Sequence, residues 1–199
     1  MMTGLRPETF QNLQLNAGVF LADFDYSSAA DKAALEDLVL AALESGEGVL
    51  GATRGGGTFQ CTPSTRTIEA DGMRYPFKGS TVNDMWTIKL TTTLIEANAE
   101  NFKRALMCAD VSTEGHVTRL TVRTAIVDED YIPHICWIGD TSEGYVLIEL
   151  DNALNLTGAN FTFTDKGEGT LPVEFQAHQA SLTDQENAPF RIVFFDKAE

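Results

Sequence analysis

Hydrophobic and polar residues alternate along many short stretches of this chain. In 84–94, Trp86, Ile88, Leu90 and Leu94 share one parity, and three threonines and a lysine occupy the other. This period of two is typical of strands in an antiparallel sheet that has one solvated face. The same pattern or a short apolar run predicts further strands, at 17–24, 65–70, 73–78, 117–127, 131–138, 144–150, 158–165, 171–179 and 190–195.

Two segments follow the helical period instead. In 27–46 an apolar stripe recurs every three or four residues, with Ser28 as a candidate N-cap and Gly46 as a candidate C-cap. A second helix is predicted over 94–107, where Glu100 and Arg104 are spaced to form an ion pair. The predicted stripes are Leu35, Leu38, Val39, Ala42 and Leu43 in the first helix, and Ile95, Ala99, Phe102 and Leu106 in the second.

Many strands with only two helices do not fit a repeating β-α-β order. They favour a mainly β fold, an antiparallel β-sandwich or barrel with two α-helices. No linker interrupts the pattern, so 1–199 is interpreted as one domain. Trp86 and Trp137 both lie in apolar strand contexts and are expected to be buried.

The composition narrows the function classes. The net charge is −15, from 29 acidic and 14 basic residues, so tight binding to nucleic acid is not expected. No apolar run approaches the twenty or so residues of a membrane span. The first eleven residues lack the basic and apolar regions of a secretory signal. Cys61, Cys108 and Cys136 are far apart and are expected to be reduced, buried thiols in a cytosolic chain.

A glycine-rich stretch, GEGVLGATRGGGT at 46–58, resembles two nucleotide-binding motifs. Gly46, Gly48 and Gly51 match G-x-G-x-x-G, and 51–58 is close to a P-loop but lacks its lysine. Both motifs hold phosphate at the N-terminus of a following helix. Here the glycines follow a helix, whose C-terminal end carries partial negative charge, and precede an extended segment. Nucleotide binding is therefore not expected.

Other candidate chemistry has simpler explanations. His116, His134 and His178 are isolated in sequence, with no metal-binding spacing. No G-x-S-x-G nucleophile motif occurs. Two further acidic groups are explained as residues in turns between strands. One group is Asp128, Glu129 and Asp130, and the other is Asp23 and Asp25. We therefore expect no catalytic site, cofactor, metal or small-molecule substrate, and a structural role rather than an enzymatic one.

Four stretches together resemble the tail tube (major tail) proteins of long-tailed bacteriophages and of prophages in Gram-positive bacteria. They are NAGVFLADFDYS (16–27), LGATRGGGTFQCTPSTRTIEADG (50–72), LIEANAENFKRAL (94–106) and EFQAHQASLTDQENAPFRIVFF (174–195). The resemblance implies a β-sandwich-like barrel flanked by a helix, similar to the tube protein of type VI secretion systems. It also implies a virion structural protein, made in the host cytoplasm, that forms stacked hexameric rings.

Such a tube encloses a tape-measure protein and later conducts DNA, and its ends meet a tail terminator and a tail initiator. The resemblance does not distinguish a flexible, non-contractile tail from a contractile one. An acidic lumen would repel DNA in transit. Within this picture, a helix-containing loop or arm around 27–58 is expected to reach a neighbouring subunit. The candidate contact residues are Arg54, Gly55, Gly56 and Gly57, together with Asp23 and Asp25.

A second function class stays open. A β-sandwich can serve as a binding module for carbohydrate or protein without catalysis, and exposed aromatic side chains on a flat face would support this role. The expected burial of Trp86 and Trp137 counts against it.

Overall fold

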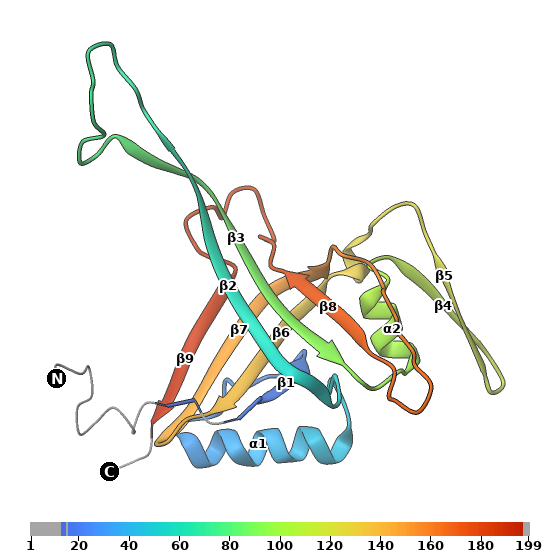
Figure 1. The fold of residues 1–199 in the computed structure, drawn as a ribbon. Coiled ribbons are helices and arrows are strands. Elements are labelled where there is room, and N and C mark those ends of the chain that lie inside the picture. The colour runs from blue at the N-terminus through green and yellow to red at the C-terminus, as the bar shows by residue number, and fades with distance from the viewer. Residues whose placement is uncertain (1–12, 15, 197–199) are drawn as a thin grey trace.

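A computed structural model of this chain describes residues 13, 14 and 16–196. Its fold is mainly β with two α-helices (Figure 1). The prediction that the chain lacks a secretory signal concerns residues 1–11, which lie outside the described residues. The elements are β1 (Val19–Ala22), α1 (Lys32–Ser45), β2 (Thr53–Thr67), β3 (Thr81–Leu94), α2 (Ala99–Ala105), β4 (Ala109–Glu114), β5 (Val117–Val122), β6 (Ile132–Asp140), β7 (Gly144–Asn155), β8 (Leu171–Gln176) and β9 (Phe190–Asp196).

Strand β7 joins two antiparallel layers. Its residues 144–150 pair with β9 and its residues 145–153 pair with β6, which pairs in turn with β1. Its last two residues, Leu154 and Asn155, pair with β8, which continues into β3 and β2. Together the two layers form a seven-stranded sheet, whereas β4 and β5 form a separate hairpin that projects from the body of the described chain (Figure 1).

Two hydrophobic cores lie on opposite sides of the layer that contains β6 and β7. One core fills the space between the two layers, and Phe20, Leu90, Leu150 and Phe175 are fully or almost fully buried there. The other lies between the layer and α1. Its buried members are Leu21, Leu35, Cys136, Ile138, Leu147 and Phe195. The molecule is therefore a helix on a sheet on a second sheet, as expected for a mainly β fold with a flanking helix.

Helix α1 follows its prediction closely but begins later. Asp31, rather than Ser28, is the N-cap, because its side chain accepts a hydrogen bond from the Ala34 amide at 2.9 Å. The helix ends at Gly46, as predicted; this glycine has a φ of 72° and donates its amide to Ala42. Leu43 is 44% exposed, so the packed face is narrower than the predicted stripe.

Helix α2 is shorter than predicted. Strand β3 runs to Leu94, and the Ile95 amide still bonds to the Ala52 carbonyl, so these residues belong to the sheet. Asn98 then caps the helix by accepting a hydrogen bond from the Asn101 amide. The buried residues of the helix are Asn101 and Ala105, and Phe102 packs on the core between the layers. The predicted Glu100–Arg104 ion pair is confirmed at 3.5 Å.

Several predicted strands differ from the structure in extent, and three differ most. The strand predicted at 117–127 ends at Val122 as β5. The segment 158–165 forms only an isolated bridge through Thr162, and 73–78 is a turn region at the end of the β2–β3 hairpin. In each case the alternating pattern continues past the last available pairing partner. Cys108 and Cys136 are buried as predicted, whereas Cys61 is only partly buried.

Neither helix in the described part of the chain is both long and apolar enough to cross a bilayer.

Candidate functional site

The outer half of the β2–β3 hairpin, residues 63–86, projects from the body of the molecule as an arm (Figure 1). Near the body, β3 alternates between buried and partly buried positions from Leu94 back to Ile88, whereas the positions of β2 are partly buried or exposed. From Trp86 outward most side chains are exposed, because no second layer covers this part of the hairpin. The end of the arm lies far from α1, which is on the opposite side of the molecule (Figure 1).

The arm carries five large exposed apolar side chains. Their exposed fractions are 52% for Ile68, 82% for Tyr75, 63% for Phe77, 61% for Met85 and 54% for Trp86. The burial predicted for Trp86 is therefore wrong, because β3 has already left the body at that residue. Trp137 is partly buried and packs on the core between the layers. Apolar side chains gathered in this way on a segment without a core commonly mark an interaction surface.

Three glycines of the glycine-rich stretch lie within a strand, in the region where a helix-containing loop or arm was expected. Gly55, Gly56 and Gly57 lie inside β2, where the pairing with β3 shifts register between Thr53 and Gly57. Gly55 and Gly56 have φ values of 77° and 73° in this irregular part. A Cβ at Gly57 would lie 2.6 Å from the ring of Phe20. The glycines therefore let β2 bend and pack closely over the core.

Arg54 already has a partner within the chain. Its guanidinium pairs with the Glu168 carboxylate, and both side chains are more than half exposed. A contact of the Arg54 guanidinium with a neighbouring subunit, for which Arg54 is a candidate, would therefore have to replace this pair. An exposed pair of this kind contributes little to stability.

The acidic cluster at 128–130 serves the fold. The Asp130 side chain is 3% exposed, pairs with Arg123 and accepts a hydrogen bond from the Val127 amide at 2.8 Å. Arg123 also pairs with Asp110 at 2.6 Å, at the base of the β4–β5 hairpin. Asp130 thus ties a short 3-10 turn to that hairpin, which agrees with the turn interpretation of this cluster.

Asp23 and Asp25 lie directly after β1. Asp25 accepts a hydrogen bond from the Ser27 amide at 2.8 Å, and this bond lowers the pKa of its carboxyl. Asp23 has a φ of 55°, and its amide donates to the His134 carbonyl. Both residues are turn carboxylates, and both line a cavity of about 410 Å³ beside His134, Glu149 and Arg191.

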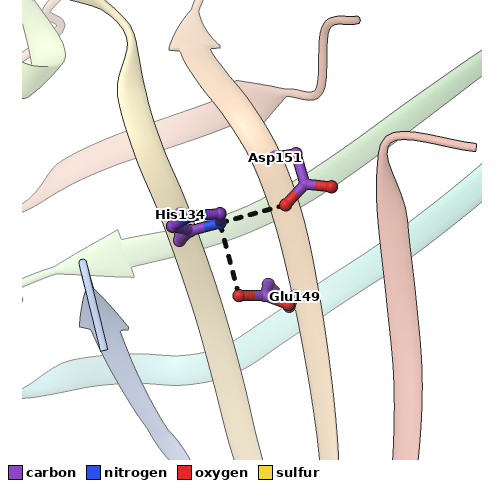
Figure 2. A group of neighbouring side chains, drawn as sticks. All are labelled: His134, Glu149 and Asp151. Carbon is purple, nitrogen blue, oxygen red and sulfur yellow. Dashed lines mark hydrogen bonds and ion pairs between the residues drawn. The ribbon is translucent and has the colours of Figure 1, made fainter. Parts of the chain in front are cut away.

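A polar cluster that no sequence motif indicated lies at this cavity (Figure 2). The Nδ1 atom of His134, on β6, is 3.0 Å from Asp151 Oδ1 and 3.4 Å from Glu149 Oε1, on β7. The Glu149 side chain is only 5% exposed. Its other oxygen, Oε2, accepts hydrogen bonds from Arg191 at 2.6 Å and from the Tyr26 hydroxyl at 2.9 Å.

We expect the phenol of Tyr26 to make the stability of the fold sensitive to alkaline pH. Burial, together with the hydrogen bond to Glu149, raises the pKa of Tyr26 to about 12, against about 10 in an unfolded chain. The folded state holds this proton more tightly, so its stabilising effect is complete below pH 10 and is lost as the pH rises through 12. We expect the free energy of unfolding to fall more between pH 9 and pH 11.5 in the wild type than in Tyr26→Phe, as measured by urea titration. Equal losses in the two proteins would contradict this role.

A scan against known protein-family models and a search of curated proteins found no match for this chain.

Proposed function

We propose that this chain is a structural subunit that self-assembles, and specifically that it forms the stacked hexameric rings of a phage tail tube. The observation that carries the proposal is the exposed arm. Five large apolar side chains stand on a two-stranded segment that has no second layer of its own. A hairpin of this kind gains stability when another surface covers it. A second copy of the chain is the partner that the proposal assigns to it.

In the proposed assembly, the arm of one copy contacts a different surface of the next copy. The arm end and the opposite side of the molecule, where α1 lies, are different surfaces (Figure 1). A contact between two different surfaces generates rings or linear stacks, whereas a twofold dimer uses the same surface twice. Rings and stacks are the arrangement that a tube requires.

The composition and the sequence resemblance support the same proposal. The net charge of −15 suits a conduit that must not bind the DNA passing through it. The four stretches that resemble tail tube proteins include 50–72, which contains all of β2 and the first part of the arm. In this proposal the further partners are a tape-measure protein inside the tube and the tail terminator and tail initiator at its ends, and the protein is located in the virion tail.

A binding module remains the second candidate, and one observation favours it. Trp86 is 54% exposed and Tyr75 is 82% exposed, and exposed aromatic rings are common in surfaces that bind carbohydrate or protein. These rings lie on a narrow hairpin, whereas a flat carbohydrate site needs a broad face. This arrangement suits an interface with protein better than one with a sugar chain.

Self-assembly can be tested by light scattering coupled to size-exclusion chromatography, over a hundredfold range of protein concentration. We expect the mass of the main species to rise from that of one 21.7 kDa chain to that of rings and larger assemblies. Binding to a glycan array by a protein that stays monomeric at every concentration would favour the binding module instead.

A further inference from the structure

The structure assigns a divalent transition-metal site, best suited to Zn²⁺, to His134, Glu149 and Asp151 (Figure 2). One ligand atom from each of these residues lies within 4.8 Å of the other two. This site is independent of the arm and of the proposed assembly function. No sequence pattern predicted it, because its ligands come from two different strands and no metal motif joins them.

The two distances from the His134 ring nitrogen to the carboxylate oxygens suit a zinc ion. Ligands at about 2.0 to 2.1 Å from a tetrahedral zinc ion are separated from one another by roughly 3.3 Å. The His134 Nδ1 atom is 3.0 Å from Asp151 Oδ1 and 3.4 Å from Glu149 Oε1. One imidazole and two carboxylates are ligands that Zn²⁺ accepts. A water molecule would complete the coordination from the adjoining cavity of about 410 Å³.

Paired strands hold all three ligands in place. His134 lies directly opposite Asp151 in the β6–β7 register, and Glu149 lies two residues before Asp151, so the three share one face of the layer. Glu149 is held further by the Tyr26 hydroxyl. Ligands fixed by a sheet need little rearrangement to receive an ion, which favours binding.

Arg191 is the competing cation in this cluster. It bonds mainly to Glu149 Oε2, whereas His134 faces the other oxygen, Oε1. Only Asp151 Oδ1 contacts both side chains: it lies 3.1 Å from Arg191 and 3.0 Å from His134. The Arg191 side chain is 53% exposed and can move away from Asp151 while it keeps its bond to Glu149. An ion at His134 would therefore displace one arginine contact.

The charge around the cavity favours a cation. Asp23 and Asp25 line it along with Glu149, and Asp151 lies within contact distance of the same arginine. Four carboxylates thus surround one guanidinium and one imidazole. A divalent ion would balance the remaining negative charge, and Arg191 would then act as a second partner that orients Glu149.

Calorimetric titration of the full chain with ZnCl₂ tests this assignment. Bound metals are first removed with a chelator. We expect one Zn²⁺ per chain, at least about tenfold weaker binding in His134→Ala and Asp151→Asn, and unchanged binding in His116→Ala. His116 is an exposed histidine at the β4–β5 turn and serves as the matched control. Circular dichroism of each variant confirms folding, which the partial exposure of His134 should preserve.

Arg191→Gln provides the sharper comparison. If Arg191 competes with the ion for Asp151, this variant should bind Zn²⁺ more tightly than the wild type. Weaker binding in Arg191→Gln would contradict the competition. Absence of zinc binding in the wild type, or binding that survives His134→Ala and is lost in Cys61→Ser, would overturn the assignment.

Discussion

Replacing Phe77 and Trp86 together by serine is expected to abolish assembly while leaving the isolated chain as stable as the wild type. Both side chains are more than half exposed, so their loss should change the free energy of unfolding by less than about 0.5 kcal/mol each. At the centre of an interface, a large aromatic residue is commonly worth about 2 kcal/mol or more. Losing one such residue weakens association by roughly thirtyfold, and losing two leaves no assembly at accessible concentrations.

The matched control is the double variant Phe163→Ser and Leu182→Ser. These residues are even more exposed, at 79% and 93%, but neither lies on the arm. The control should assemble like the wild type, as judged by light scattering at equal concentration. Equal loss of assembly in both double variants would show that general surface hydrophobicity, rather than the arm, drives association.

Truncation of Phe175 to alanine is expected to cause the largest loss of stability. Phe175 is fully buried on β8, where it pairs with Leu90 of β3 and with Asn155 of β7 at the junction of the two layers. Removing its ring leaves a cavity that this junction cannot close, at a cost of roughly 3–5 kcal/mol. Urea unfolding followed by tryptophan fluorescence measures the loss.

Phe163→Ala is the control for this substitution, because it removes the same ring from an exposed position. Its free energy of unfolding should stay within about 0.5 kcal/mol of the wild type. If Phe175→Ala were as mild as Phe163→Ala, the two layers would not be packed through Phe175.

The general architecture was predictable because the period of two is strong wherever one face of a strand is buried. The strands that became β3 and β8 show it, those that became β6, β7 and β9 were predicted from short apolar runs, and Gly46 ended the first helix as predicted. Boundaries were less predictable. Nothing in the pattern of 94–107 showed that Ile95 bonds to Ala52 and so keeps the start of this segment in the sheet.

The arm was missed because alternation reports strand geometry and not burial. Trp86 has the same parity as Ile88 and Leu90, yet it is exposed while they are buried. The difference depends on where the opposite layer ends, which a single strand does not encode. The glycines at 55–57 were interpreted as part of a loop or arm for a similar reason. A close approach to Phe20 and a bend in β2 require glycine just as a loop does.

The polar cluster of His134 follows from the strand register, which the sequence pattern alone does not specify. The β6–β7 hairpin closes at Asp140 and Tyr145, and this pairing places His134 opposite Asp151. Both strands were predicted, but their alternation by itself does not specify which residues face one another. Arg191 could not be placed in the same way, because β9 is separated from β7 by more than thirty residues of chain.

Negative-stain electron microscopy of the concentrated wild-type protein tests self-assembly through the arm most directly. We expect rings of uniform diameter that stack into hollow tubes, and only single particles in the Phe77→Ser and Trp86→Ser double variant at the same concentration. Single particles in both samples, or tubes in both, would contradict assembly through the arm.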